Sequence, residues 1–318
     1  MKLPYFLNSG KNVKFFYFLK AGLDMLVPHA LRKPWQEIWK EACTRKDFDY
    51  IMQRVNYYCK AVKPLGDKAV AISDIKLRDA ASVYYFDLME AMQPFPKTTE
   101  INFLPGDITF IPSVPSLTKS RPIEGDNINS VLLKLNRIRH YIWVKDIMEY
   151  SDESDTAIFR GKVSNKKKRM RLFREYFSQP GLDLGDVSSH PCDNAWKVEK
   201  MSIADQLKYK FILSIEGNEV ASNLKWIMNS NSVAVMPRPE YETWFMEGTL
   251  VPGEHYIEIK KDYSDLAEVL DYYRSHPRQA QEISANAREY CRQFRNDRRE
   301  HIITTLVIAK YIGVLPDV

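Results

Sequence analysis

The chain has 318 residues, and its 46 basic side chains outnumber its 41 acidic ones only slightly. This length usually forms more than one hydrophobic core, so we expect two domains. A formal charge of +5 is too small to imply a nucleic-acid-binding protein, although part of the basic excess is concentrated in one stretch, Lys162–Arg174. No apolar run approaches the roughly 20 residues that span a bilayer, and the first residues lack the pattern of a signal peptide.

The four cysteines and six histidines are scattered along the chain. No CxxC pair occurs and no histidines have the spacing of metal ligands, so we expect neither a zinc site nor another cofactor. The cysteines are expected to be reduced packing residues. Together with the lack of an apolar span, these features predict a cytoplasmic protein.

In the first half of the chain, helices alternate irregularly with short strands. Apolar periodicity predicts helices at residues 12–27, 34–58 and 77–92, and strands at 69–75, 107–111 and 140–144. The segment Lys11–Lys33 combines large apolar residues with basic ones, a pattern that an interfacial helix would also have. We expect a core helix with a basic outer face, because the apolar stripe is wide. Peripheral contact with the inner face of a membrane is the alternative.

The second half has a more regular pattern. The acidic stretch Glu149–Asp155 is polar and lacks apolar periodicity, so it predicts a linker. After it, expected strands alternate with expected helices, which predicts a parallel sheet. The strands are expected at 156–159, 182–184, 211–215, 233–235 and 256–259, and the helices at 166–177, 203–207 and 221–228. Helical patterns from Ser264 and from Pro277 to about Ile312 complete the chain.

Two glycine turns follow expected strands of this sheet, Phe159-Arg160-Gly161-Lys162 and Glu216-Gly217-Asn218. Both would lie at the carboxyl ends of their strands, where open parallel sheets bind ligands. Backbone N–H groups and the basic side chains at these turns suit a phosphate. The second turn is followed by further polar candidates: Ser222, Asn223 and Lys225. The alternative is that both turns are structural and that Asn218 caps a helix.

Neither turn matches GxGxxG or GxxxxGK[ST], which disfavours a standard dinucleotide fold and a P-loop ATPase. The stretch Lys162–Arg174 is rich in basic residues and would attract an anion, or it is a solvated helix start. The stretch Pro239–Phe245 places two carboxylates among aromatic rings, a combination that suits a sugar. A packing patch is the alternative there.

Several of these motifs follow one another in a specific order. They are Phe159-Arg160-Gly161, Lys208-Tyr209-Lys210-Phe211, Glu216-Gly217-Asn218, Lys225, Ser232–Val235, Tyr241–Phe245 and His255–Ile259. This order resembles glycosyltransferase family 90, which includes fungal capsule-associated proteins, animal protein O-glucosyltransferases and bacterial lipopolysaccharide-modifying enzymes. The resemblance extends from about residue 105 to about residue 295. Within it, Lys119–Leu133 is similar to the bacterial branch.

The resemblance implies an α/β fold of the GT-B type, with two Rossmann-like domains facing across a cleft and a long C-terminal helical tail. It further implies a nucleotide-sugar donor, no obligatory metal ion, and inversion at the anomeric carbon. We therefore expect an N-terminal acceptor-side domain at residues 1–150 and a nucleotide-sugar-binding domain at 151–295. A C-terminal helix at 296–318 is expected to pack back on the N-terminal domain.

The resemblance also implies roles for single residues. It places Arg160, Gly161, Gly217, Asn218 and Lys225 around the diphosphate and ribose of the donor, and Glu242 near the donor. The family often has an arginine where this chain has Asn223, so a fixed phosphate charge is missing there. Lys162, Lys225 or Arg121 would replace it.

A second departure concerns the catalytic base. Eukaryotic members place Arg-Asp-Tyr-Pro after the strand equivalent to residues 108–111, with its Asp as the base, whereas this chain has Val114-Pro115-Ser116. An inverting transfer needs a group that takes the proton of the acceptor hydroxyl. Asp126 is our first candidate and Glu124 our second. The alternative for Asp126 is that it caps a helix beginning near Asn129.

The sequence therefore predicts a bacterial-type glycosyltransferase that moves a hexose or pentose from a UDP-sugar to a cell-surface glycan, such as lipopolysaccharide or capsule. Its expected partners are the nucleotide-sugar donor and a glycan or glycolipid acceptor, and no nucleic acid is expected. The alternative function is a non-catalytic nucleotide-sugar or glycan-binding protein of the same fold.

Overall fold

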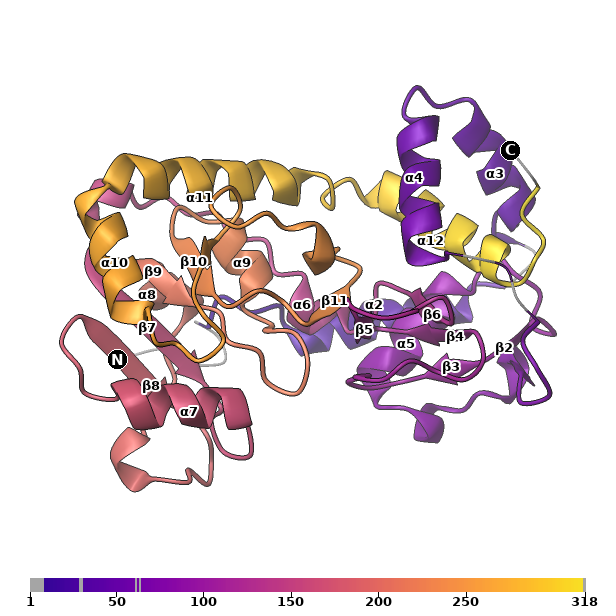
Figure 1. The fold of residues 1–318 in the computed structure, drawn as a ribbon. Coiled ribbons are helices and arrows are strands. Elements are labelled where there is room, and N and C mark those ends of the chain that lie inside the picture. The colour runs from indigo at the N-terminus through magenta and orange to yellow at the C-terminus, as the bar shows by residue number, and fades with distance from the viewer. Residues whose placement is uncertain (1–8, 29–30, 61, 63, 317–318) are drawn as a thin grey trace. The chain divides into compact units, whose positions relative to one another are not determined.

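The computed structural model describes residues 9–28, 31–60, 62 and 64–316. The chain folds into two compact units, each assembled from separate stretches of sequence. Unit 1 contains residues 1–12, 139–239 and 247–293, and unit 2 contains residues 13–138, 240–246 and 294–318. Figure 1 labels their helices and strands.

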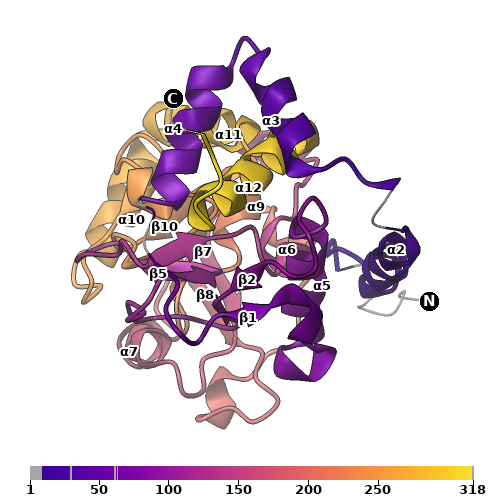
Figure 2. The ribbon, with the colours of Figure 1, turned by 90° about the vertical axis from the view of Figure 1, so that its right-hand side faces the viewer.

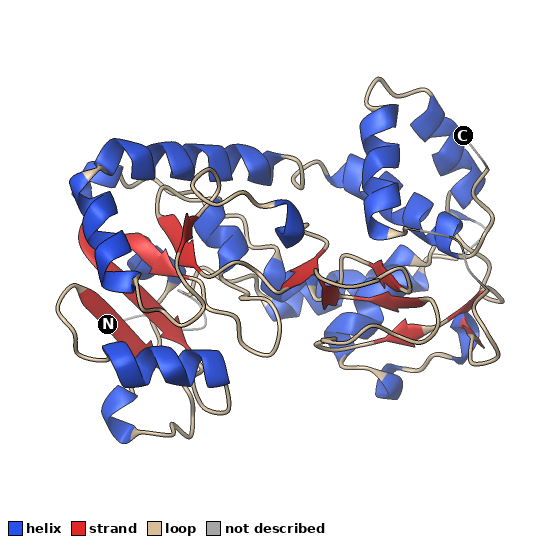
Figure 3. Ribbon diagram, in the orientation of Figure 1, coloured by secondary structure: helices blue, strands red, loops and turns tan. Residues whose placement is uncertain are grey.

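Unit 1 is built around a five-stranded sheet in which all paired strands are parallel (Figure 3). Its strands are β7 (Ser154–Gly161), β8 (Leu182–Asp186), β9 (Tyr209–Leu213), β10 (Val233–Met236) and β12 (Ile257–Glu258). The neighbouring strands β9 and β10 contain the buried apolar runs Phe211–Leu213 and Val233–Met236, as expected where both faces of a sheet are covered. Phe211 and Ile212, which point to opposite faces of β9, are both fully buried.

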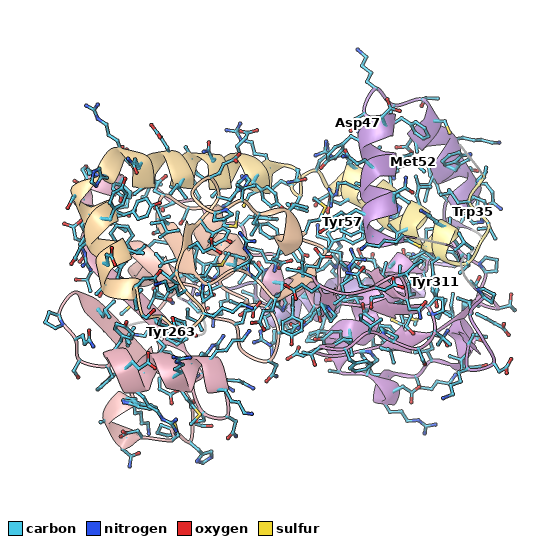
Figure 4. The ribbon with its side chains drawn as sticks, viewed as in Figure 1. Trp35, Asp47, Met52, Tyr57, Tyr263 and Tyr311 are labelled. Carbon is cyan, nitrogen blue, oxygen red and sulfur yellow. The ribbon has the colours of Figure 1, made fainter. Side chains whose placement is uncertain are left out.

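Helices complete the core of unit 1. They are α7 (Lys167–Tyr176), α8 (Ile203–Gln206), α9 (Leu224–Met228), α10 (Leu266–Ser275) and α11 (Pro277–Arg292), with short 3-10 helices η4 (Tyr150–Asp152), η5 (Asn194–Trp196) and η6 (Glu247–Thr249). Leu172 and Phe173 of α7 pack in one core cluster with Ile283 of α11. Tyr263, labelled in Figure 4, belongs to the same cluster, and its hydroxyl donates to the carbonyl of Lys168 at 3.1 Å. Side chains of the sheet and of three helices thus share one core.

Unit 2 combines longer helices with small sheets. Its helices are α2 (Lys14–Leu26), α3 (Trp35–Cys43), α4 (Phe48–Tyr58), α5 (Ser82–Ala91), α12 (Asp297–Tyr311), η2 (Ile72–Asp74) and η3 (Leu77–Asp79), and α6 (Arg137–His140) lies where the sequence passes from unit 2 to unit 1. Its strands are β1 (Val70–Ala71), β2 (Glu100–Ile101), β3 (Phe103–Leu104), β4 (Ser116–Thr118), β5 (Ser120–Pro122), β6 (Ser130–Leu132) and β11 (Tyr241–Thr243). The strands β3, β4 and β6 form a parallel sheet in that order, and β5 pairs antiparallel with β11, as β1 does with β2.

The core of unit 2 depends on its last helix. Helix α12 packs against α3 and α4 (Figure 2). Asn296 caps it, since its side chain accepts a hydrogen bond from the backbone N–H of Arg299 at 3.0 Å. Ile302, Leu306 and neighbouring residues are fully buried, as expected of a helix in a core. Tyr311, labelled in Figure 4, donates to the carbonyl of Pro115 at 3.1 Å.

The structure confirms the parallel sheet predicted for the second half of the chain, and it divides two predicted helices. The helix expected at 34–58 is interrupted between α3 and α4, where Arg45 pairs with Asp47 at 2.7 Å. The tail expected from Pro277 to Ile312 is interrupted between α11 and α12. The prediction for residues 12–27 matches α2.

Two strand predictions in the first half are wrong. Residues 107–111 form a loop, because the hydroxyl of Ser120 both accepts from the N–H of Ile108 at 3.2 Å and donates to its carbonyl at 3.0 Å. Residues 140–144 are also irregular beyond the end of α6, and the carbonyl of Val144 accepts from the side chain of Asn229. Side chains thus satisfy backbone groups that a neighbouring strand would otherwise occupy.

The predicted linker Glu149–Asp155 is wrong as well. It lies within unit 1, where it forms η4 and the first residues of β7. Tyr150 is 8% exposed and Glu153 only 4% exposed. Two buried side chains thus anchor this segment in unit 1, although its other residues are exposed.

Candidate functional site

The strand order of unit 1 defines where a ligand would bind. Along the sheet the order is β12-β10-β9-β7-β8, so the chain moves outward from β7 to β8 and then returns to the other side of β7 as β9. This reversal is a topological switch point. In open parallel sheets, ligands bind beyond the carboxyl ends of the two strands that flank the switch. Gly161 ends β7, and Gly217 lies shortly after the end of β9.

The side chain of Arg169, near the start of α7, joins the two glycine turns. Its guanidinium donates to the carbonyl of Lys162 at 2.9 Å and to the carbonyl of Ile215 at 2.8 and 3.0 Å. A Cβ atom at Gly217 would lie 3.2 Å from this guanidinium, and one at Gly161 would lie 3.4 Å from it. Glycine therefore favours the close approach of Arg169 at Gly217, whereas at Gly161 the ring of Phe159, 2.7 Å from the position of a Cβ atom, is the closer obstacle to a side chain. The two predicted turns are brought together by a residue that the sequence prediction did not name as a site residue.

Two further residues at the start of α7 hold the second turn. The ammonium group of Lys168 pairs with Glu216 at 2.5 Å, and that of Lys166 donates to the side-chain oxygen of Asn218. Asn218 does not cap α9, because Asn223 occupies the position before that helix. The basic stretch Lys162–Arg174 is thus more than a solvated helix start, since three of its side chains reach the turn at Gly217.

The charge of Arg169 lies in a partly buried position. Burial and the neighbouring charge of Arg139 lower the pKa of Arg169 to about 10, which leaves it cationic at neutral pH. The side chain of Lys162 is exposed beside it. An anion at the carboxyl ends of β7 and β9 would therefore lie near the oriented charge of Arg169 and the exposed charge of Lys162.

Asn223 and Lys225 have structural contacts rather than open donor groups. The side chain of Asn223 donates to the carbonyl of Leu213 at 3.1 Å and accepts from the hydroxyl of Ser214 at 3.2 Å, so it ties α9 to the end of β9. Lys225 is fully buried, and its ammonium group lies 2.6 Å from the carboxylate of Glu247. The structure does not direct Lys225 to the glycine turn. Ser222 is half-buried just before α9.

Arg160 is directed to β8 instead of the turn that follows it. Its guanidinium makes two 2.7 Å bonds to the carboxylate of Asp183, which also accepts from the hydroxyl of Tyr209 at 3.1 Å. The side chain of Arg160 is 8% exposed and borders an open hollow of about 570 Å³ that Tyr209 and Lys200 also line. The geometry therefore separates Arg160 from Arg169 and Gly217, with which the sequence prediction grouped it.

In unit 2, the predicted donor residues Arg121 and Glu242 form a buried pair. They face each other across β5 and β11, and their side chains meet at 2.7 Å. Arg121 also donates to the carbonyls of Ser130 and Tyr57, at 3.1 and 2.9 Å, and the hydroxyl of Tyr57 donates to Glu242. The side chains of Arg121 and Glu242 are only 1% and 4% exposed. Their contacts fasten residues 240–246 to unit 2, so the pair acts as a structural clamp.

The aromatic residues after Glu242 are also part of the core. Trp244 is fully buried, stacks on Tyr58 with ring centroids 3.9 Å apart, and donates to Glu300 at 2.6 Å. Burial acts to raise the pKa of Glu300, but Arg54 and Lys134 outweigh burial and hold that pKa below its ordinary value. These contacts are the ones that the packing alternative for Pro239–Phe245 expects, and sugar binding by this stretch stays a prediction.

The two predicted bases lie in an exposed turn of unit 2. Glu124 and Asp126 flank Gly125, whose φ of +90° favours glycine. Asp126 accepts a hydrogen bond from the N–H of Ile128 at 3.3 Å. No helix begins at Asn129, because β6 starts at Ser130, so this contact stabilises a turn and caps no helix.

Asp107 is a carboxylate that the sequence analysis missed. It follows β3 after Pro105 and Gly106, at the carboxyl end of a parallel strand. The buried ammonium group of Lys119 pairs with it at 2.7 Å, while the carboxylate of Asp107 remains 29% exposed. The sequence prediction placed the strand at 107–111, which put Asp107 inside the strand and the expected base after it. With the strand at 103–104, Asp107 takes the position that follows a strand.

The loop from Asp107 also borders a hollow in unit 2 of about 530 Å³. Apolar and aromatic side chains dominate its lining, with a few polar groups among them, the composition that is usual for small-ligand sites. Among the residues that line it are Phe103, Phe110, Pro112, Asp74 and Asp79. Ile111 reaches Gly125, since a Cβ there would lie 3.3 Å from its Cδ1. The hollow and the turn of Glu124 and Asp126 therefore share one loop.

Neither metal binding nor membrane spanning has support in the part of the chain that the structure describes. Within it, no group of three or more His, Cys, Asp or Glu side chains is placed to hold a metal ion. Over the same residues, no helix has the length and apolar character needed to cross a membrane. What the geometry does provide is a cationic arginine at two glycine turns in unit 1, and a carboxylate and an apolar hollow in unit 2.

Comparison with known proteins finds similar sequences. The model of glycosyl transferase family 90 matches residues 116–306, which include both glycine turns and Arg169. The O-glucosyltransferase LpsA of Dichelobacter nodosus is 37% identical over 267 residues, which are 83% of this chain and 83% of that protein. Protein O-glucosyltransferase 3 of Homo sapiens is 24% identical over 166 residues, which are 50% of this chain and 32% of that protein.

Proposed function

The chain belongs to glycosyltransferase family 90 and is a glycosyltransferase, and from this premise we propose that it transfers a sugar from a UDP-sugar to an acceptor hydroxyl with inversion. We propose glucose as the first sugar to test, because two of its relatives are named O-glucosyltransferases. The GT-B fold is part of this proposal. Its support is that each unit has a parallel sheet of its own.

The observation that carries the proposal is the meeting of the two glycine turns at Arg169. A nucleotide diphosphate at this switch point would accept hydrogen bonds from backbone N–H groups, and its charge would be balanced by Arg169 and Lys162. In the transfer step the bond between the anomeric carbon and the diphosphate oxygen breaks, and the diphosphate leaves with both electrons. Positive groups fixed beside that oxygen stabilise the charge as it develops.

The donor site is tested most cleanly through Lys162, which is exposed and makes no side-chain contact in the described structure that its removal would disturb. We expect Lys162→Ala to weaken UDP binding about tenfold, since a hydrogen bond to a charged group contributes about 1.5–3 kcal/mol before screening. The matched control is Lys46→Ala, an exposed lysine of unit 2. Calorimetric titration with UDP measures the affinity of each variant for UDP. Equal affinities for the two variants would refute the donor position.

For the base we propose Asp107 in preference to Asp126 and Glu124. Lys119 orients the carboxylate of Asp107 and leaves it partly open, whereas Asp126 is engaged in its turn. The base takes the acceptor proton while the acceptor oxygen attacks the anomeric carbon, a contribution of about 10²- to 10⁴-fold in rate. Asp107→Asn should therefore reduce kcat by about that factor while UDP affinity stays unchanged. A large loss in Asp126→Asn or Glu124→Gln, with an active Asp107→Asn, would reverse the assignment.

For the acceptor we propose a glycan or glycolipid of the cell surface, of the lipopolysaccharide or capsule type, bound at the hollow of unit 2. Aromatic rings stack on the CH faces of sugars, and carboxylates accept from their hydroxyls. Phe110 is 55% exposed at this hollow, so Phe110→Ala should raise KM for the acceptor severalfold at little cost in stability. The control Ile147→Ala removes an exposed apolar side chain from unit 1. An unchanged KM in Phe110→Ala would exclude the hollow. A cytoplasmic location is part of the same proposal.

A further inference from the structure

Helix α2 has two apolar faces, and among the residues that the structure describes only one of these faces finds packing partners. Tyr17, Phe18 and Ala21 form the packed face. The hydroxyl of Tyr17 donates to Asp87 of α5 at 2.6 Å, and the ring of Phe18 meets Phe86 of α5 edge-on with centroids 5.6 Å apart. Ala21 is 8% exposed. This face holds α2 against α5. Through it, α2 contributes to the core of unit 2.

The second face carries large apolar side chains that remain exposed. They are Phe15 (68% exposed), Phe16 (67%), Leu19 (49%), Leu23 (57%) and Leu26 (77%). With about 3.6 residues per turn, these positions fall within a sector of roughly 100°, opposite the packed face. Single exposed apolar residues are ordinary, but a continuous exposed stripe marks an interaction surface. The expectation of a core helix with a basic outer face therefore holds for only one side of α2.

Apolar and basic residues extend this surface beyond the helix. Val13, Val27 and Leu31 are 48%, 41% and 77% exposed. Between Val13 and Pro34 the chain has four basic side chains, Lys14, Lys20, Arg32 and Lys33, and a single carboxylate, Asp24. The guanidinium of Arg32 donates to the carbonyl of Val27 at 3.2 and 3.3 Å, which holds the residues after α2 against its carboxyl end.

The exposed apolar stripe and the basic residues around it indicate which kind of surface could cover α2. A second copy of the chain would bring the same basic residues together across a symmetric contact, which is electrostatically unfavourable. A bilayer with anionic headgroups offers both an apolar boundary for the aromatic and leucine side chains and negative charge for the lysines. We propose that α2 lies in the surface of an anionic phospholipid bilayer, with Phe15, Phe16 and Leu23 on its buried side. This inference does not depend on the proposed acceptor or donor.

Flotation with lipid vesicles tests the proposal on the full chain. Vesicles of phosphatidylethanolamine and phosphatidylglycerol, three to one, should carry the protein, and vesicles of phosphatidylcholine should bind it much more weakly. The double variant Phe16→Ser/Leu23→Ser should lose at least about tenfold in partitioning. Lys14→Glu/Lys20→Glu should lose a similar factor on the anionic vesicles alone. Leu77→Ser, an exposed leucine of η3, is the control that should bind like the wild type.

Three outcomes would overturn the proposal. The first is wild-type protein that stays unbound on anionic vesicles, and the second is a stripe variant that floats as well as the wild type. The third is a wild-type dimer, seen by sedimentation, that the stripe variant converts to a monomer, because a second copy would then be the occupant. The exposed positions of Phe16 and Leu23 make misfolding of the variant unexpected. The independent pair Phe15→Ser/Leu26→Ser should reproduce the loss.

Discussion

Glu153 makes the stability of unit 1 depend on pH in a direction opposite to that of most carboxylates. It is 4% exposed, and neither oxygen of its carboxyl group has a hydrogen-bond partner among the described residues. Burial raises its pKa to about 8, and the negative charge of Asp146 adds to the rise, while Lys210 and Arg288 oppose it. The folded protein therefore holds this carboxyl group neutral at pH values where the unfolded chain ionises it.

The sign and size of the effect follow from linkage. Below the unfolded pKa of 4.5 the group is protonated in both states and has no effect. As the pH rises toward the folded pKa of about 8, the unfolded chain gains from ionisation and the folded protein does not, so stability is lost across this range. Between pH 5 and pH 8 the loss is roughly 3 kcal/mol, since one unit of pKa corresponds to about 1.4 kcal/mol.

Urea unfolding of the wild type and of Glu153→Gln at pH 5, 6, 7 and 8 measures this loss. The variant should lack this decline in the free energy of unfolding. From pH 5 to pH 8, the free energy of unfolding of the variant should therefore rise by roughly 3 kcal/mol relative to that of the wild type. The two proteins are compared by how their free energy of unfolding changes with pH and not by its absolute value. The buried amide of the variant would also lack hydrogen-bond partners, which changes the absolute value at every pH. Glu149→Gln, at an exposed position of the same stretch, should follow the wild type. Parallel curves for the wild type and Glu153→Gln would refute the reasoning.

Three further substitutions have effects that the contacts predict. Arg160→Ala should lower the free energy of unfolding by about 1–3 kcal/mol in urea titration, because its carboxylate partner on β8 loses two bonds. Gly161→Ala should cost about 1–3 kcal/mol, since the new Cβ would lie 2.7 Å from the ring of Phe159, while Gly22→Ala, with open space around it, should cost nothing. Trp244→Ala should lower the melting temperature most, with a loss of about 3–5 kcal/mol. A Trp244→Ala protein as stable as the wild type would contradict the stacked, buried position of that ring.

The sequence was most informative where secondary structure is continuous and apolar. The strands β9 and β10 are buried runs bounded by turn residues, so their type and order could be predicted, and with them the edge at which a ligand would bind. The position of Gly217 followed from that edge. The direction of side chains could not be predicted in the same way. Arg160 and Arg169 are both basic residues near a glycine turn, and only the pairing of Asp183 with one of them decides which guanidinium reaches the turn.

Unit 2 was harder to predict because its strands are two or three residues long. So few residues are too short for apolar periodicity to indicate a strand. In addition, the pairing of β5 with β11 joins residues more than a hundred positions apart in the chain. Glu242 therefore looked like a donor contact beside aromatic rings, when its partner was Arg121 across a strand pair. The misplaced strand at 107–111 likewise hid Asp107. The division of the chain into discontinuous units could not be read from local composition.

This discontinuity bears on how the protein is made. Helices α3 and α4 are synthesised long before α12, yet α12 completes the apolar side that they form together. Until α12 has left the ribosome, the face that Ile302 and Leu306 will cover has no native partner. Nascent chains therefore expose an apolar surface until α12 is made, and a truncation before Asp297 should produce aggregates that chaperones retain.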